Sequence, residues 1–153
     1  DYSIQKRNHR LIERKAHLPE EGMEFLRDLF SLIGRVLISG VFLWAAYEKI
    51  KHWNATVSYM KSKNVPQVNL VAPLVVAIKI IGGLTVLFGW HSQIGPLMLL
   101  IITIASVYKL HDFWTKAGTE RNIEQLLFMK ELAVVGGLFM ILALGAGHFG
   151  FNG

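Results

Sequence analysis

Residues 70–90 decide the fold of this chain; they read Leu-Val-Ala-Pro-Leu-Val-Val-Ala-Ile-Lys-Ile-Ile-Gly-Gly-Leu-Thr-Val-Leu-Phe-Gly-Trp. A helix of this length spans about 30 Å, the thickness of the hydrocarbon core of a bilayer. Lys79 is the charged residue in this run. A charge near the middle of a span costs on the order of 3 kcal/mol unless it reaches water or a partner. We therefore expect a membrane protein that keeps a charged side chain where lipid penalises it.

Three further apolar runs accompany this one, over residues 29–47, 94–108 and 126–146. The chain is 52% hydrophobic and 18% charged, which is too apolar for an ordinary soluble domain. Four such runs with short connections predict an all-α, polytopic membrane protein. Its fold would be an antiparallel bundle of four transmembrane helices with both termini on one side. The expected helices lie near residues 28–50, 69–90, 93–114 and 123–147.

The first 28 residues differ in character from the rest. Residues 1–28 carry six basic and six acidic side chains, and we expect them to form a polar head before a transmembrane domain over residues 29–153. A break is expected at Leu18-Pro19, followed by a short amphipathic helix that enters the first span. The head is either a solvated lead-in or an arm that grips a neighbouring protein.

The chemistry open to the chain is limited by what it lacks. It has no cysteine, which excludes disulfide exchange, iron–sulfur clusters and thiolate-bound metals. The net charge of +5 is typical of lysines near anionic lipid headgroups, and no nucleic-acid readout motif is present. We therefore expect membrane lipid, and not nucleic acid, as a partner. Basic residues are balanced between the two sides, so the positive-inside rule does not give the orientation.

Ionisable residues of the predicted spans gather in one half of the bundle. The second and fourth spans begin on the side opposite the termini, here called the far side, and the first and third spans end there. Counting about 1.5 Å per residue places most of these charges at similar depth, while one arginine stands alone towards the near side. The candidate pocket residues are Arg35, Glu48, Lys49, Lys79, His111, Asp112, Lys130 and Glu131.

Two interpretations of this charge cluster remain open. In the first, the charges pair inside the bundle, with Lys79 matched by Glu131 or Asp112, and the rest anchor helix ends at the headgroups. In the second, they line a polar pocket that opens to the far side and holds a polar head group, a quinone ring or a proton path. Ionisable residues inside spans favour a functional site by default.

Metal and haem chemistry are weaker alternatives. Bis-histidine haem would need His52 facing His111, or His91 facing His148, across the bundle. No carboxylate–histidine spacing on one helix face indicates a metal site, so no metal ligand is assigned. Lys79 as a Schiff-base lysine is a further minor alternative.

Six short motifs follow one another along the predicted spans. They are Gly34-Arg35-Val-Leu, Phe42-Leu-Trp-Ala-Ala-Tyr-Glu48-Lys49, Val65-Pro66, Lys79-Ile-Ile-Gly82-Gly83-Leu with Phe88-Gly89, His111-Asp112-Phe113-Trp114, and Phe128-Met-Lys130-Glu-Leu-Ala-Val-Val-Gly136-Gly137-Leu. In this order and spacing they resemble the DoxX family of small four-helix membrane proteins, including its plant branch, the lesion-inducing-like proteins. The resemblance covers about residues 30–147 and leaves the head outside.

The resemblance implies the four-helix fold and leaves the role open. Members of the family include a thiosulfate:quinone oxidoreductase subunit and partners of redox enzymes, while others act as escorts for client proteins. Many bacterial members carry Glu where this chain has Lys79, whereas plant-type members share the Lys. Bacterial redox roles are therefore not carried over to this chain.

From these observations we expect an accessory or structural subunit of a larger membrane complex, respiratory or redox in character. The alternative is a DoxX-type oxidoreductase module that binds a quinone in a polar intramembrane pocket, and whether the chain is an enzyme stays open. Apart from quinone or lipid, no bound cofactor is expected, and other subunits of the complex are the expected protein partners. The expected location is a bacterial inner membrane or an organellar one, such as the mitochondrial inner membrane.

Overall fold

The computed structural model describes residues 2–91, 93–145, 147 and 149–150. Its elements, in chain order, are α1 (Tyr2–Lys51), α2 (Trp53–Ser62), α3 (Val68–Phe88), α4 (Ile94–Leu110), the short 3₁₀ helix η1 (Phe113–Thr115) and α5 (Gly118–Leu144). Among these residues, four segments are long and apolar enough to cross a membrane: Glu20–Lys51, Val68–Phe88, Ile94–Thr115 and Gly118–Leu144. The predicted all-α fold with four spans is confirmed.

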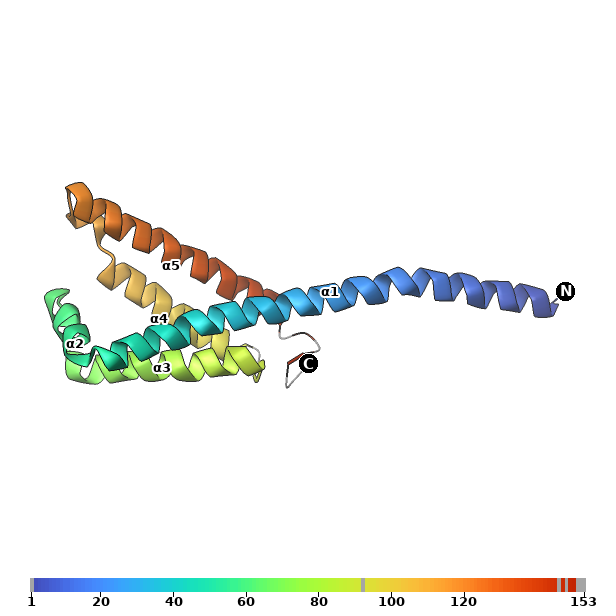
Figure 1. Ribbon diagram of the computed structural model, residues 1–153, viewed down its shortest axis with the longest axis horizontal. Helices are drawn as coiled ribbons and strands as arrows, with labels where there is room; N and C mark the ends of the chain where they lie inside the picture. The colour runs from blue at the N-terminus through green and yellow to red at the C-terminus, as the bar shows by residue number, and fades with distance from the viewer. Residues whose placement is uncertain (1, 92, 146, 148, 151–153) are drawn as a thin grey trace.

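The four long helices pack as an antiparallel bundle (Figure 1). The helix α1 packs against α3 and α5, and α4 packs against the same two helices. It follows that α1 and α4 lie diagonally across the bundle. The near side is marked by Asp28, because a Cβ placed on Gly147 would lie 2.7 Å from the Asp28 carboxylate. The far side is where α1 ends at Lys51 and α2 begins.

The expected break at Leu18-Pro19 is absent, because the backbone of α1 is one continuous helix of 50 residues. Proline removes one helical hydrogen bond, and the many other bonds of a long helix carry the backbone past that gap. The N-terminal half of α1 therefore extends beyond the bundle as a continuation of the first span (Figure 1). The short separate amphipathic helix was a wrong prediction.

The first connection contains a helix that the sequence interpretation did not include. This helix, α2, packs Met60 into a small apolar cluster with Val68 and Ala72 at the start of α3. Trp53 and Val57 cover the same cluster from the α2 side. This burial explains why the segment folds back on the bundle instead of running as an open loop. It places α2 across the far end of the bundle.

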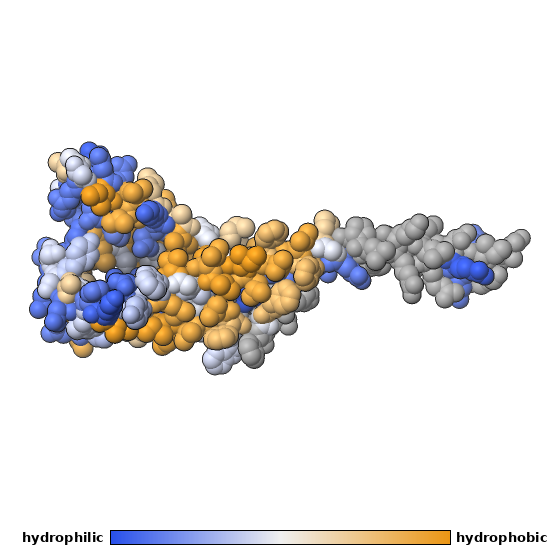
Figure 2. All heavy atoms as spheres, in the orientation of Figure 1, coloured by the Kyte–Doolittle hydropathy of each residue, from blue (hydrophilic) through white to orange (hydrophobic). Residues whose placement is uncertain are grey.

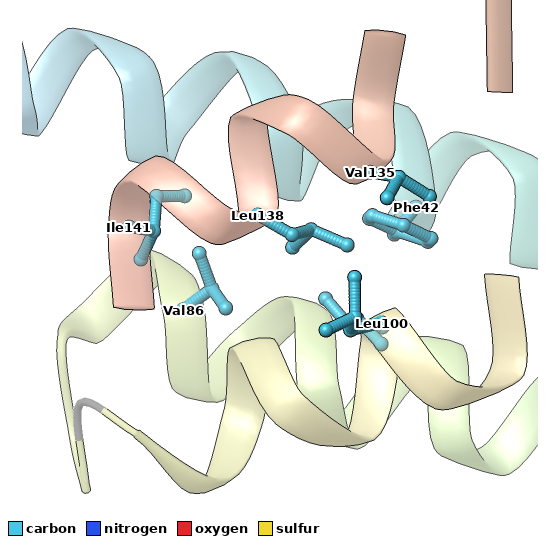
Figure 3. Packing of buried hydrophobic residues seen from close by; sticks show 7 residues of the cluster. Phe42, Val86, Leu100, Val135, Leu138 and Ile141 are labelled. Atoms are coloured by element: carbon cyan, nitrogen blue, oxygen red, sulfur yellow. The ribbon is translucent and has the colours of Figure 1, made fainter. Parts of the chain in front are cut away.

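The main apolar core packs side chains of α1, α3, α4 and α5 against one another (Figure 3). It consists of Phe42, Val86, Leu99, Leu100, Val135, Leu138 and Ile141. Small residues let the helices approach closely around it, as membrane packing requires. A Cβ on Gly82 would lie 2.7 Å from Leu99, and one on Gly83 would lie 3.1 Å from Leu43. The expected close-packing role of this glycine pair is confirmed.

The outer surface of the bundle is apolar over the middle of the spans, and hydrophilic residues gather at its far end (Figure 2). Large apolar side chains such as Leu37, Trp44, Leu70 and Met140 are more than half exposed. An apolar surface of this extent needs lipid around it, because in water it would drive aggregation. The surface therefore agrees with the span lengths.

Candidate functional site

Lys79 points into the bundle, as the sequence interpretation expected. Its side chain is 7% exposed, and its Nζ lies 5.7 Å from the centre of the Phe42 ring on α1. A cation over an aromatic face is attracted by the ring quadrupole. Among the described residues, no carboxylate forms an ion pair with Lys79. The buried ammonium therefore lies against an aromatic ring and has no carboxylate as an ion-pair partner among the described residues.

A cavity of about 320 Å³ opens beside Lys79 in the far half. We call it the α2 cavity, because α2 forms one wall with Thr56, Tyr59 and Met60. The other walls come from the four spans. They contribute Lys49, Val75, Lys79, Ser106, Leu110, His111 and Glu131, and Ala55 of α2 completes the lining. A volume of this size is at the lower end of what small-molecule sites occupy.

A second cavity, of about 180 Å³, lies between α1 and α5. We call it the α1–α5 cleft. It is lined by Val41, Phe42 and Ala45 on α1, by Leu127, Lys130, Glu131 and Val134 on α5, and by Lys79 and His111. Lys79, His111 and Glu131 line both cavities. These three side chains therefore form the junction of one bipartite site.

A network of charged side chains ties α2 to the opposite corner of the bundle. Lys63, which follows α2, contacts Asp112 Oδ1 at 2.5 Å and Glu124 Oε1 at 3.4 Å. Glu124 Oε2 accepts a hydrogen bond of 2.9 Å from His111 Nδ1. We call Lys63, His111, Asp112 and Glu124 the latch. Its side chains are 10% to 28% exposed, so water screens it only partly.

The charges of the latch raise the pKa values of Lys63 and Tyr59. Burial by itself would lower the pKa of Lys63, but its hydrogen bonds to Asp112 and Glu124 outweigh that effect and raise the pKa. Burial and the nearby Glu124 carboxylate raise the pKa of Tyr59, whose hydroxyl donates a hydrogen bond of 3.2 Å to the Leu110 carbonyl. Lys63 and Tyr59 therefore stay protonated at neutral pH.

His111 links the latch to the cavities. A carboxylate can only accept, so with Glu124 ionised the His111 Nδ1 carries the proton. In the neutral ring, Nε2 is then left as an acceptor, and His111 lines both cavities. This arrangement is the usual way in which a second residue fixes the tautomer of a histidine at a site. His111 can accept or relay a proton there.

The structure brings together five of the eight residues predicted for the pocket. They are Lys49, Lys79, His111, Lys130 and Glu131. Glu48 lines neither cavity, and its Oε2 lies 3.5 Å from His52 Nε2. Asp112 belongs to the latch, where Lys63 is its partner, so the expected pair of Lys79 with Asp112 is wrong. The expected pair of Lys79 with Glu131 is also not formed, although the two residues line the same cavities.

Arg35 is not part of this site. It is 1% exposed and lies in the near half of the first span, as its position in the sequence indicated. Within the part of the chain that the structure describes, none of its three guanidinium nitrogens has a hydrogen-bond partner.

Sequence reasoning missed Lys63, Glu124 and the α2 wall. The long first connection gave a signal for α2, because Trp53, Val57 and Met60 follow a helical spacing. By sequence alone, Lys63 is typical of a lysine at the level of the lipid headgroups. Glu124 is typical of an acidic residue in the first turns of a helix. Their pairing joins residues 61 positions apart, and nothing local in the sequence indicates it.

Within the part of the chain that the structure describes, no three His, Asp or Glu side chains converge in a way that could hold a metal ion. The site is instead made of cationic and hydrogen-bonding groups around an apolar floor. Such groups suit the oxygen atoms of an organic molecule.

Four apolar spans around a buried polar junction define a multi-pass integral membrane protein. The DoxX family model matches residues 30–112, more than half of the chain, and the protein belongs to the DoxX family. The family expected from the motifs is thus confirmed. The match covers the first three spans and ends at Asp112 of the latch.

Three relatives extend the comparison. The chain is 28% identical to the inner membrane protein YqjF of Escherichia coli over 85% of this chain and 95% of that protein. It is 21% identical to the E. coli inner membrane protein YphA, over 79% and 86% of the two chains. It is 24% identical to the Surfeit locus protein 4 homolog of Schizosaccharomyces pombe, over 92% of this chain and 42% of that protein. No solved structure matches the chain.

Proposed function

We propose that this protein binds the polar head of a membrane-borne amphiphile, a quinone or a lipid, in the α2 cavity and the α1–α5 cleft. The observation that carries the proposal is the position of the cleft. It lies between two transmembrane helices and shares Lys79, His111 and Glu131 with the α2 cavity. A molecule dissolved in the bilayer can therefore approach these side chains without first entering water.

The packing of α1 on α5 supports this route. The two helices touch near the middle of the membrane, where a Cβ on Gly137 would lie 2.6 Å from Ile38 Cδ1. Beyond that contact, towards the far side, the cleft opens between Val41 and Leu127. These two side chains are 53% and 37% exposed on the lipid-facing surface. The residues at the opening of the cleft are thus apolar, as an entrance from lipid requires.

The charges of the site support a head group rich in oxygen. Lys49, Lys79 and Lys130 contribute three cations, and Glu131 contributes one carboxylate. An excess of cations favours phosphate, carboxylate or quinone oxygens, all of which accept hydrogen bonds from ammonium groups. Lys79 in particular has no acid to release before it can contact a ligand.

The relatives indicate where the protein works. Both E. coli relatives are inner membrane proteins by name, and we assign this chain to the same kind of membrane. Quinones are constituents of such membranes, and phospholipids are present in all of them. If the ligand is a quinone, electrons would have to come from a partner, because a chain without cysteine cannot supply them from thiols.

The experiment for this proposal compares native mass spectra of the wild-type protein, Lys79→Met and Lys61→Met, each purified in mild detergent with added short-chain quinone or phospholipid. Lys61 is an exposed lysine on α2 that lies outside both cavities, so its variant is the matched control. Binding to the wild-type protein and to Lys61→Met, with at least tenfold weaker binding to Lys79→Met, supports the proposal. Equal binding by all three contradicts it.

A second candidate function is that of an accessory subunit in a larger membrane complex. The observation that favours it is the projecting N-terminal half of α1 (Figure 1). The helix is continuous from Tyr2 to Lys51, so its first turns stand clear of the four packed spans. A continuous helix that stands clear of the bundle offers a neighbouring protein a surface to pack against. This role is supported if a stoichiometric partner co-purifies with the full chain and is lost when residues 1–26 are deleted. If the partner co-purifies equally well after the deletion, the N-terminal half of α1 is not the contact to the partner.

A further inference from the structure

A further cavity, of about 580 Å³, lies between α4 and α5 and shares no residue with the α2 cavity or the α1–α5 cleft. We call it the α4–α5 groove. It is lined by Ile104, Val107 and Tyr108 on α4 and by Phe128, Leu132 and Val135 on α5, and Trp114 of η1 completes the lining. Ile104 and Leu132 are each 50% exposed, so the groove opens on the lipid-facing surface of the spans. A volume of this size is within the range of small-molecule sites.

A cluster of aromatic rings bounds the groove at its far end. The Tyr108 and Trp114 rings lie 6.1 Å apart, centre to centre. Phe113 packs edge to face on Trp114 at 5.3 Å and on Phe128 at 5.2 Å, which ties η1 to α5. Tyrosine and tryptophan favour the level of the lipid headgroups. The groove therefore begins near the headgroups on the far side and runs from there into the hydrocarbon.

An unpaired cation lies beyond this end of the groove. Arg121 precedes Phe128 by seven residues, so it lies on the same face of α5, about 10 Å nearer the far-side water. The acid next to it, Glu120, pairs with Lys116 at 2.9 Å. Arg121 itself is exposed and forms no ion pair with any residue that the structure describes. It therefore offers its charge to an anion at the level of the headgroups.

We propose that the α4–α5 groove binds one anionic phospholipid, with one acyl chain in the groove and the phosphate group at Arg121. The apolar lining matches a hydrocarbon chain, and the fit is one of close contact between apolar atoms. A guanidinium and a phosphate form paired, charge-assisted hydrogen bonds. A zwitterionic phospholipid can fill the groove with the same chain, but it carries its own cation next to the phosphate. Arg121 thus gives the site its preference for an anionic lipid.

The lining of the groove suits an acyl chain better than a helix of a second copy of this protein. Helices in membranes pack closely where small residues let their backbones approach. The lining contains no glycine, alanine or serine. A helix with its side chains is also about 10 Å wide, and the aromatic cluster bounds the groove at its far end. A flexible chain can follow such a groove into the hydrocarbon.

This lipid site is separate from the site of the proposed function. Phe128, Leu132 and Val135 face α4, whereas the α1–α5 cleft uses other residues of α5, among them Leu127 and Glu131. Lys79→Met should therefore leave the groove intact, even though it weakens binding at the other site. The two proposals can fail independently of each other.

The test records native mass spectra of the full chain in mild detergent, with added phosphatidylglycerol or phosphatidylcholine of identical acyl chains. Each substitution is made in the wild-type protein and in Lys79→Met. Both backgrounds should bind one phosphatidylglycerol about tenfold more tightly than phosphatidylcholine. Arg121→Gln should abolish this preference in the Lys79→Met background. Lys61→Gln, which removes an exposed lysine of α2, should retain it.

A second pair of variants tests the groove itself. Leu132→Trp places a large ring in the groove and should weaken the binding of both lipids about tenfold. Leu126, which is 57% exposed on α5, lies outside the groove, so Leu126→Trp should bind lipid as the wild type does.

Four outcomes overturn the proposal. They are equal binding of the two lipids in the Lys79→Met background, an unchanged preference in Arg121→Gln, equal lipid binding by Leu132→Trp and Leu126→Trp, and loss of the bound lipid in Lys79→Met. A dimer that Leu132→Trp dissociates would assign the groove to a second copy of the chain, and this result also overturns the proposal.

Discussion

Lys63 and Asp112 join the end of α2 to the segment before α5 through an ammonium–carboxylate contact of 2.5 Å. The contact crosses the far end of the bundle and holds α2 over the cavity that contains Lys79. Glu124 shares the same ammonium and also holds His111. The wall of the polar site and the histidine at its junction thus depend on one set of charges.

Lys63→Met should loosen α2. The substitution leaves Asp112 and Glu124 without their shared cation, and half-buried carboxylates in this situation cost about 1–3 kcal/mol. The chain has no cysteine, so a single Met60→Cys substitution on the buried side of α2 reports its opening. We expect thiol-reactive label to react faster with Met60→Cys when Lys63→Met is present, while Lys61→Met leaves the rate unchanged. Equal rates in all three backgrounds would show that the latch does not hold α2.

The latch should survive mildly alkaline pH. Because the pKa of Lys63 is raised above its ordinary value of 10.5, its contribution to stability is fully present below about pH 10 and is lost as pH rises through the raised pKa. The difference in unfolding temperature between the wild-type protein and Lys63→Met should therefore stay constant from about pH 7 to pH 10 and shrink above that. A difference that already vanishes at pH 9 would be inconsistent with a raised pKa.

Lys79→Met should stabilise the ligand-free protein while weakening ligand binding. The side chains are of similar length, and the substitution removes a buried charge that has no ion-pair partner. We expect the variant to be about 1–3 kcal/mol more stable in the absence of ligand. Thermal unfolding without added amphiphile measures this. A destabilised variant would mean that the contact of Lys79 with Phe42 is worth more than the cost of burying the charge.

Gly82→Ala should destabilise the bundle, and Gly136→Ala should not. A methyl group on Gly82 meets Leu99 at 2.7 Å, whereas nothing lies within 4 Å of the corresponding position on Gly136. Overpacking costs about 1–3 kcal/mol, while alanine in an open helical position stabilises by up to about 1 kcal/mol. Unfolding temperatures of the two variants check this, and an equal effect of both would contradict the packing of α3 on α4.

The spans could be predicted from the sequence because each is a run of apolar residues long enough for a bilayer. The orientation of Lys79 followed from the same reasoning, since Gly82 and Gly83 mark the packed face of its helix. What could not be predicted is how charges pair at the far end. Lys63 and Asp112 are 49 positions apart, and their meeting depends on α2 folding back over α3. The continuous backbone at Pro19 was missed because a long helix tolerates one lost hydrogen bond.

The most direct test of the central proposal is photo-labelling in a bilayer with a quinone or phospholipid that carries a photoreactive group near its head. The protein is reconstituted with this probe, irradiated and mapped by peptide mass spectrometry, with Lys79→Met as the comparison. The proposed site predicts label on residues 41–45 of α1 and 127–134 of α5, and its loss in Lys79→Met. Label spread evenly over the lipid-facing surface, or unchanged in Lys79→Met, would contradict a polar site entered from the membrane.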